Sequence, residues 1–231
     1  MKLAIMQPYF FPYLGYFQLM REAETFVFYD DVTFIKGGWI NRNTILSLNG
    51  PIRITLQVQG ASSNKLINEV GLGTNRPALL KTITQAYAKA PFRDAVMPLV
   101  ERCLDFEDDR LAPFLHHTLK ETARFIGLET SFLVSSELEH TPGLAAQERV
   151  LDMCRRLKAT HYINPIGGKD LYDKAAFRTN GLDLSFLECT PKPYAQFKRT
   201  PEFVPYLSIL DALMFLGPDN LEDHLAAFTL S

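Results

Sequence analysis

The segment 36–43 carries the densest set of ligand-recognition side chains in the sequence: Lys36, Trp39, Asn41, Arg42 and Asn43. Lysine and arginine bind phosphate or carboxylate groups, asparagine makes directed hydrogen bonds, and the indole ring of the only tryptophan offers a stacking surface. A solvated loop does not need this mixture. We therefore predict that the segment faces a ligand, with Arg42 among the catalytic residues and the other four binding substrate.

Two adjacent carboxylates, Asp30 and Asp31, follow the apolar run Thr25–Tyr29. Such groups can bind a metal ion, orient a hydroxyl group or accept a proton. Neighbouring side chains diverge along an extended chain, so at most one of them should point into a crevice. We predict that Asp30 or Asp31 acts as a general base. His116 and His117 are adjacent and face different ways on a helix, so they make a poor metal site, and no metal ligands are assigned.

An abrupt turn follows the first apolar run, Leu3–Met6. Prolines fix its backbone, glycine allows close approach, and aromatic rings can line a pocket. The predicted substrate-binding residues of this turn are Gln7, Pro8, Tyr13, Gly15 and Tyr16. Gln7 and Asn41 are expected to orient the substrate, and Trp39 or Tyr16 to stack on a base or a sugar.

A glycine-rich turn follows a later strand, Thr160–Ile163. Backbone N–H groups of glycines can face an anion, and a lysine adds a positive charge. The spacing is not that of a P-loop, and the same pattern suits a tight turn with an exposed lysine. The predicted binding residues here are Asn164, Gly167, Gly168, Lys169 and Tyr172. Four later residues are expected to complete the far wall: Tyr194, Gln196, Ser208 and Asp211.

These clusters of residues can meet only if the strands that precede them end at the same edge of one sheet. A strand, a helix from about residue 12 to 23 and a second strand, all within about thirty residues, predict a βαβ unit and a parallel sheet. If the strands ending at Gln7, Asp30 and Asn164 are parallel and adjacent, their polar ends share one crevice. The three clusters are therefore predicted to converge.

The remaining elements complete an α/β fold. Asn49-Gly50 between residues 44–48 and 52–58 predicts an antiparallel hairpin that extends the sheet. Helical periodicity predicts three consecutive helices within 76–127, and residues 182–187 are expected to form the last strand. We expect one α/β domain over residues 1–231, with a mainly parallel Rossmann-like sheet flanked by helices, an added β-hairpin and a helical insertion.

The composition of the chain argues against some classes of function. The chain has 231 residues, 47% of them hydrophobic, and a net charge of −2. No basic run is present to grip nucleic acid, and no apolar stretch reaches the roughly 18 residues of a membrane helix. Three widely spaced cysteines, Cys103, Cys154 and Cys189, are expected to be reduced thiols. We therefore expect a cytoplasmic protein that acts on a small molecule and neither binds nucleic acid nor inserts into a membrane.

Several motifs together resemble the WbqC-like proteins. They are Gln-Pro-x-Phe-Phe-Pro-x-x-Gly-Tyr-Phe from Gln7, Asp30-Asp31-Val32, Trp39-x-Asn-Arg-Asn43, the turn from Tyr162 to Tyr172, and Leu207-Ser-Ile-Leu-Asp211. The chain has Thr33 where the family often has glutamine, and Asn164-Pro165 where it often has Ser-Gly. The resemblance implies a bacterial transferase of O-antigen or lipopolysaccharide biosynthesis that moves an acyl or glycyl group to a nucleotide-linked amino sugar.

Two other functions remain open. One is a nucleotide-binding or sugar-binding module without catalysis. The other is an adenylate-forming or nucleotidyl-transferring enzyme, because Tyr13-Leu-Gly-Tyr16 stands where such enzymes place a His-x-Gly-His turn. The cofactors that these functions suggest are ATP or a divalent cation.

Overall fold

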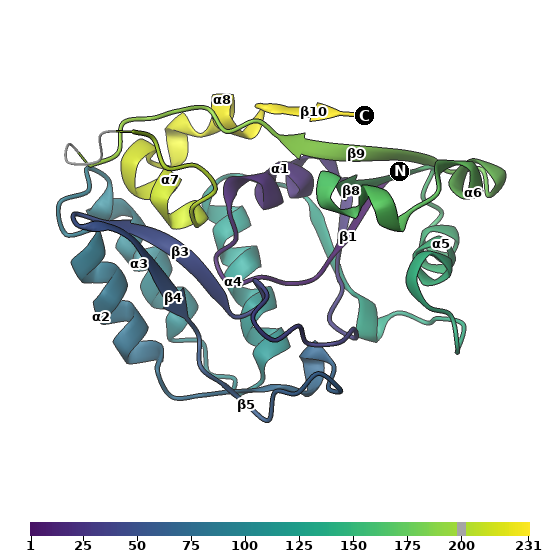
Figure 1. Ribbon diagram of the computed structural model, residues 1–231, viewed down its shortest axis with the longest axis horizontal. Helices are drawn as coiled ribbons and strands as arrows, with labels where there is room; N and C mark the ends of the chain where they lie inside the picture. The colour runs from purple at the N-terminus through teal and green to yellow at the C-terminus, as the bar shows by residue number, and fades with distance from the viewer. Residues whose placement is uncertain (198–201) are drawn as a thin grey trace.

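The computed structural model describes residues 1–197 and 202–231. A six-stranded sheet forms its centre (Figure 1). The strand order is β10 (Phe228–Leu230), β9 (Asp183–Cys189), β8 (His161–Pro165), β1 (Lys2–Met6), β2 (Thr25–Phe28) and β7 (Ser131–Val134).

The pairing of β1 with its neighbours fixes where a ligand can bind. β1 pairs in parallel with β2 on one side and with β8 on the other. The chain moves outward from β1 to β2 and β7, then returns to the far side of β1 for β8 and β9. The strand order therefore reverses between β1 and β8, and open α/β sheets bind ligands outside the carboxyl ends of their strands at such a point. The predicted parallel, adjacent arrangement of these three strands is confirmed.

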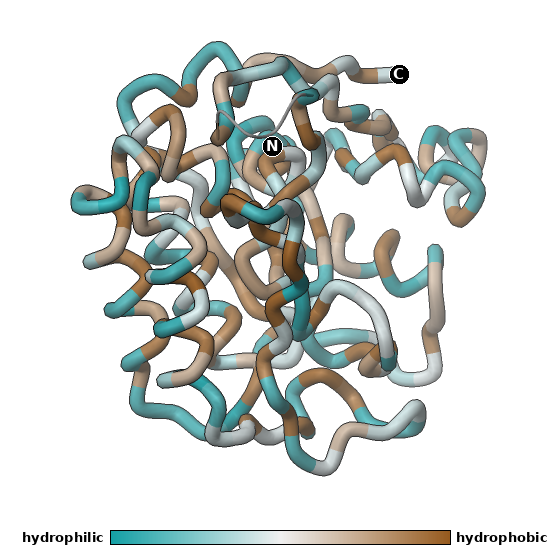
Figure 2. The backbone as a smooth tube through the Cα atoms, turned by 60° about the vertical axis from the view of Figure 1, so that its left-hand side comes forward, coloured by the Kyte–Doolittle hydropathy of each residue, from teal (hydrophilic) through white to brown (hydrophobic). Residues whose placement is uncertain are grey.

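Helices cover both faces of the sheet because successive strand residues point to opposite sides. Ala4 and Phe28 pack into the core beneath α1 (Leu14–Glu22) and α4 (Leu111–Phe125). Leu3 and Ile5 pack into a second core beneath α5 (Ala146–Arg156) and α6 (Lys174–Thr179). Figure 2 shows hydrophobic stretches concentrated along the central strands and hydrophilic stretches toward the periphery.

The predicted hairpin forms, but it does not extend the central sheet. β3 (Arg42–Ser47) and β4 (Gly50–Thr55) pair antiparallel as a separate two-stranded sheet. Ile45 and Ile54 bury their side chains in the core shared with α2 (Arg76–Ala86) and α7 (Ile209–Leu216), so the hairpin packs on helices instead of a strand edge. Figure 1 shows it beside α2 and away from α5 and α6.

The helical insertion contains α2, α3 (Arg93–Leu104) and α4, as predicted. Residues 60–73, expected to be a loop, contain η1 (Ile67–Glu69) and β6 (Gly71–Leu72), and β6 pairs with β5 (Val58–Gln59). The last predicted strand, β9, is followed by a further strand, β10, that pairs with it antiparallel. β10 is too short and too exposed to show a periodic pattern. The remaining short elements are η2 (Ser135–Glu137), η3 (Ile166–Leu171), η4 (Pro218–Asn220) and α8 (Glu222–Leu225).

None of the helices within the described residues is both long enough and apolar enough to span a membrane.

Candidate functional site

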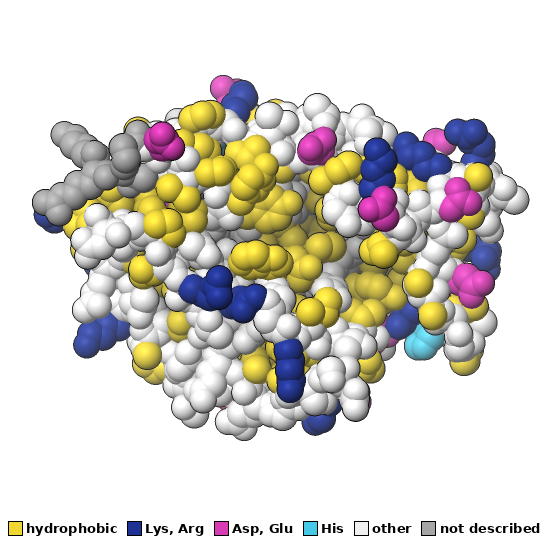
Figure 3. Space-filling model, viewed as in Figure 1, with side chains coloured by type: hydrophobic (Ala, Val, Ile, Leu, Met, Phe, Trp, Pro, Cys, Tyr) yellow, Lys and Arg dark blue, Asp and Glu magenta, His cyan; other side chains and the backbone are white. Residues whose placement is uncertain are grey.

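The carboxyl edge of the sheet gathers the polar residues that follow β1, β2 and β8. The backbone N–H of Tyr29 donates to Met6 O at 2.9 Å, so Asp30 follows β2 directly beside the point where Gln7 follows β1. On the other side, β1 pairs with β8 up to Ala4 and Ile163. Continuing that register places Gln7 beside the start of η3. Figure 3 shows a hollowed face lined by hydrophobic side chains, with Lys and Arg side chains along part of its rim.

The turn after β1 is held in a strained shape by contacts from two other segments of the chain. Phe11 has φ 40°, a left-handed conformation that is costly for a bulky residue. Its carbonyl oxygen accepts hydrogen bonds from Asn43 Nδ2 at 2.6 Å and from Ser208 Oγ at 2.7 Å. The Phe10 N–H donates to Ile40 O at 3.0 Å. We call the contacts from Ile40, Asn43 and Ser208 the turn clamp.

The turn clamp places aromatic rings around a small pocket. The pocket has a volume of about 190 Å³ and is lined by Tyr9, Pro12, Tyr13, Trp39, Asn43 and Tyr206. Tyr13 and Tyr206 meet edge to face at 6.0 Å between ring centroids. Trp39 is 52% exposed and Tyr206 is 61% exposed, so both rings offer open faces. The pocket is smaller than the roughly 300 Å³ at the low end of drug-sized sites, and therefore suits a single ring.

Arg42 lies beside this aromatic pocket. Its guanidinium carbon is 5.9 Å from the centroid of the Trp39 ring, within the range of a cation–π contact. Its Nε atom is buried without a hydrogen-bond partner. Lys36 is exposed in the same loop. Asn41 is buried and its side-chain amide donates to Leu56 O at 2.8 Å, so it holds the loop to the hairpin and does not face the pocket.

Tyr16 belongs to the interior of the turn. It is 3% exposed and its hydroxyl donates to Gln7 O at 2.9 Å, which leaves Trp39 as the stacking surface of the two predicted candidates. A Cβ atom on Gly15 would lie 2.3 Å from the Tyr13 ring. Gly15 therefore allows Tyr13 to fold back over α1, and Gln7 Oε1 lies 3.5 Å from the Tyr9 hydroxyl at the pocket wall.

Local packing requires a glycine at one position of the turn after β8. A Cβ atom on Gly168 would lie 1.9 Å from Asn164 Nδ2, whereas one on Gly167 would meet open space. Asn164 Oδ1 accepts from the Tyr162 hydroxyl at 3.0 Å, and the Tyr172 ring stands against Tyr162 at 5.7 Å between centroids. Lys169 is exposed on η3. The turn thus lies at the same edge, but of its predicted binding residues only Gly167 and Lys169 are exposed.

The two aspartates after β2 share one partner, the Ser135 hydroxyl, which lies 3.1 Å from Asp30 Oδ1, and otherwise have different partners. The backbone N–H and the hydroxyl of Ser136 donate to the Asp30 carboxylate at 3.1 and 3.0 Å. Asp31 forms an ion pair with Arg149 of α5, and it also accepts from the Ser135 hydroxyl at 2.5 Å. Burial raises the pKa of Asp30, and the hydrogen bonds from Ser136 oppose that rise. Beyond Ser135, the Asp30 carboxylate thus contacts Ser136 and the Asp31 carboxylate contacts Arg149.

A second cavity, which we call the Asp30 cavity, opens beside that carboxylate on the α4 face of the sheet. Its volume is about 590 Å³, and His116 of α4 is part of its lining. His116 Nε2 lies 3.9 Å from Asp30 Oδ2. Burial, with a smaller effect of the Lys120 charge, lowers the pKa of His116 to about 4, so this histidine is neutral at pH 7.

The predicted far wall is a buried hydrogen-bond network. Asp211 is fully buried and accepts from the hydroxyls of Tyr194 and Tyr87 at 2.7 and 3.2 Å and from Gln196 Nε2 at 2.8 Å. The Ser208 hydroxyl caps α7 and contributes to the turn clamp. These residues support the site from behind, and Tyr194 and Ser208 line a small cavity next to Tyr13.

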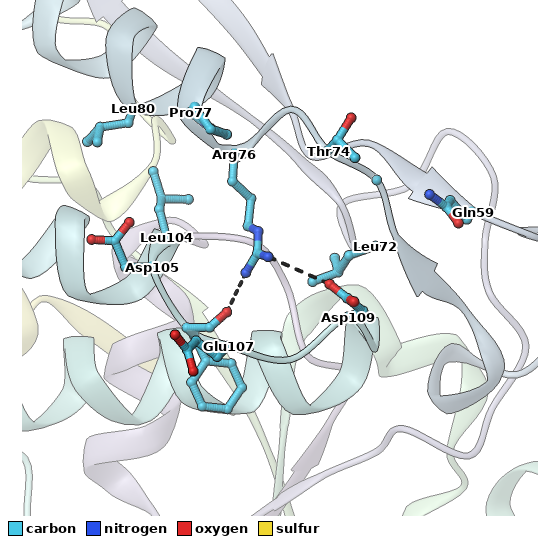
Figure 4. A pocket seen from close by; sticks show the side chains of 12 residues that line it. Gln59, Leu72, Thr74, Arg76, Pro77, Leu80, Leu104, Asp105, Glu107 and Asp109 are labelled. Carbon is cyan, nitrogen blue, oxygen red and sulfur yellow. Dashed lines mark hydrogen bonds and ion pairs between the residues drawn. The ribbon is translucent and has the colours of Figure 1, made fainter.

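A further pocket lies away from the strand ends, among α2, α3 and the start of α4 (Figure 4). Arg76 crosses it to reach Phe106 O and pairs with Asp109 at 3.7 Å, so the charge of this arginine already has partners. Among residues 1–197 and 202–231, no group of three or more His, Cys, Asp or Glu side chains is placed to hold a metal ion.

Sequence reasoning missed the residues that surround Asp30. Ser135, Ser136, Arg149 and His116 come from other elements, and only the fold brings them to β2. Paired serines at the end of β7 were the available signal, since polar residues at strand ends of a parallel sheet meet the same edge.

Comparisons with known protein families and proteins find sequences similar to this chain. The model of the WbqC-like protein family matches residues 7–223. The chain is 27% identical over 228 residues to the uncharacterized protein Rv1507c of Mycobacterium tuberculosis, and the match covers 95% of this chain and 97% of that protein. No solved structure matches significantly.

Replacement of Asn43 by alanine tests the turn clamp. The change removes both side-chain hydrogen bonds to the Phe10 and Phe11 carbonyls. The free energy of unfolding should fall by about 2–3 kcal/mol, measured by denaturant titration. The exposed Asn64 is the matched control, and N64A should stay within about 0.5 kcal/mol of wild type. Equal stability of the two variants would refute the clamp.

Acidification tests the neutral state of His116. The unfolded chain takes up a proton near pH 6.5 and the folded chain only near pH 4, so this contribution to stability is present above pH 6.5 and is lost as the pH falls toward 4. Between pH 7 and 4.5, wild type should lose about 2 kcal/mol more unfolding free energy than His116→Gln. The raised pKa of Asp30 acts in the opposite sense in both proteins, and its effect cancels to first order in the difference.

The control for this experiment is His140→Gln, because His140 is exposed. It should keep the wild-type dependence on pH. A His116→Gln variant that loses as much stability on acidification as wild type would contradict the lowered pKa.

Proposed function

Because this chain belongs to the WbqC-like protein family, we propose that it transfers an acyl or aminoacyl group to the amine of a nucleotide-linked amino sugar in the synthesis of bacterial surface polysaccharide. One observation carries the proposal. A single-ring aromatic pocket and a buried carboxylate lie at the carboxyl edge of the same parallel sheet, after the adjacent strands β1 and β2.

The aromatic pocket supports the binding of a base or a sugar ring. Trp39 provides the open stacking face, and Tyr13 lines the same pocket. Arg42 lies against Trp39 and Lys36 is exposed in the same loop, so a ring held in the pocket has cations beside it for its phosphates. In this assignment Gln7 orients the sugar, and Lys169 on η3 offers a further positive charge at the edge.

Asp30 is the proposed proton acceptor. The amine nitrogen attacks the carbonyl carbon of an activated acyl donor, a C–N bond forms, and the bond from that carbon to the leaving group breaks. The proton released by the amine passes to the Asp30 carboxylate. The raised pKa of this buried carboxyl suits a base, and Ser136 fixes its orientation through two hydrogen bonds. Asp31, paired with Arg149, is assigned a positioning role through Ser135.

The cysteines favour direct transfer over a thioester intermediate. Burial raises the pKa of Cys103 and Cys154 to about 12 and that of Cys189 to about 11, so the thiolate that would act as a nucleophile is scarce at neutral pH.

Two substitutions separate binding from chemistry. Asp30→Asn should lower kcat more than tenfold, since the isosteric amide keeps the fold but cannot accept the proton. Trp39→Ala should raise KM several-fold and change kcat little, because it removes a stacking surface used throughout the reaction. The assay is mass spectrometry of nucleotide-linked amino sugars incubated with the protein and activated acyl donors, with glycyl donors included.

Exposed residues away from the site supply the controls. Asp219→Asn on η4 and Leu230→Ala on β10 should keep wild-type kinetics. Tight binding of a nucleotide sugar without any mass change across the donor set would replace the transferase by a non-catalytic binding module. Full activity of the Asp30 variant would remove the assigned base.

A further inference from the structure

The Asp30 cavity contains buried polar atoms without partners. Apart from Asp30 and His116, its polar and charged lining residues are Asn68, Arg110, His117, Lys120, Ser136 and Glu137. His116 Nε2 and Asn68 Oδ1 are both buried and lack any hydrogen-bond partner. Leaving such atoms unpaired in a folded protein is costly, so two of them in one cavity point to a ligand that satisfies them.

The His116 ring is held by stacking, and its Nε2 has no hydrogen-bond partner. The residue is 8% exposed, and its ring stacks on Phe28 at 4.8 Å between centroids with an interplanar angle of 12°. Phe28 in turn stacks on Phe132 of β7. Asp30 Oδ2 is 3.9 Å from Nε2, too far for a direct hydrogen bond. A donor placed between the carboxylate and the ring nitrogen could reach both.

Asn68 adds a third acceptor to the cavity. The backbone N–H of Asn68 donates to Asp30 O at 3.0 Å, so η1 is tied to the residue that follows β2. Its Oδ1 atom is the unpartnered one, and an amide oxygen only accepts hydrogen bonds. Asp30, Asn68 and His116 therefore line one cavity. The carboxylate, the amide oxygen and, in the tautomer with its proton on Nδ1, the imidazole Nε2 can each accept a hydrogen bond.

This set of acceptors selects the chemistry of the ligand. An anion would meet the Asp30 carboxylate and the Asn68 oxygen, which both repel it. Of the cationic side chains that line the cavity, Arg110 is paired with Asp108 at 2.8 and 3.1 Å, and Lys120 Nζ lies over the Phe28 ring, 5.8 Å from its centroid. A primary ammonium group brings three N–H donors and a positive charge, which matches three acceptors of which one is anionic.

We propose that the Asp30 cavity binds the primary amine of the acceptor sugar between Asp30, Asn68 and His116. The inference deepens the proposed function, since it assigns the place where the acceptor is recognised as an ammonium group and adds Asn68 and His116 to the residues that recognise it. The bound ammonium group must release one proton to solvent before its nitrogen can attack, and the second proton then passes to Asp30 as the C–N bond forms. Only the choice of a sugar rests on the proposed function. Binding of an amine is expected whether or not transfer occurs.

Nuclear magnetic resonance of the full chain with ¹⁵N-labelled histidine tests the inference without any transfer assay. Titration with glucosamine should shift the ring nitrogen signals of His116 saturably and leave those of His140 unchanged. Glucose, which carries a hydroxyl in place of the amine, should give no comparable shift at the same concentration. Inorganic phosphate is the third probe and should not move the His116 signals.

Substitution of Asn68 tests the inference by strengthening the binding of glucosamine, whereas the other substitutions weaken it. Asn68→Asp replaces an amide oxygen by a carboxylate of nearly the same shape and should tighten glucosamine binding several-fold, measured by calorimetry. Asp30→Asn and His116→Gln should weaken it at least tenfold, and His140→Gln should leave it unchanged.

Four outcomes would overturn the amine site: equal shifts with glucose, a His116 shift with phosphate, weaker glucosamine binding by Asn68→Asp, or no binding of glucosamine by a folded wild-type chain. Because all these readouts measure binding, a chain that binds glucosamine at His116 but transfers nothing would refute the proposed reaction and leave the amine site standing.

Discussion

The carbonyl group of Phe11 is the point on which the candidate site depends. Asn43 from the hairpin and Ser208 from the start of α7 both donate to it, and they hold Phe11 at a positive φ that a bulky residue does not otherwise adopt. Three segments that are far apart in the sequence thus meet at one turn. The aromatic pocket exists because this turn directs Tyr9 and Tyr13 toward Trp39.

The next strand end is organised by a second, separate network. Ser135 and Ser136 at the end of β7 bind the two aspartates that follow β2, and Arg149 reaches Asp31 from α5 on the other face of the sheet. Asp30 is thereby turned toward α4 and Asp31 toward α5. The residues proposed to bind a ring and the residue proposed to accept a proton thus lie at neighbouring strand ends, and a separate set of contacts holds each.

Part of this arrangement could be predicted from the sequence. The βαβ unit, the parallel strands β8, β1 and β2, the hairpin and the three helices follow from local patterns of apolar residues and from Asn49-Gly50. Long-range packing could not be predicted. Nothing local says that the hairpin leaves the central sheet, that β10 adds to its edge, or that Asn43 binds the turn backbone. The sequence indicates only that His116 is a poor metal ligand, because its stacking on Phe28 depends on how α4 crosses the sheet.

Trp39 allows the most direct measurement, because it is the only tryptophan in the chain and lies in the aromatic pocket. Titration of the protein with uridine diphosphate glucosamine should change its tryptophan fluorescence saturably, and the Asn43→Ala variant should require a higher ligand concentration because its turn is released. An emission spectrum that stays constant up to millimolar ligand, in a folded wild-type protein, would contradict the assignment of this pocket to a nucleotide-linked sugar.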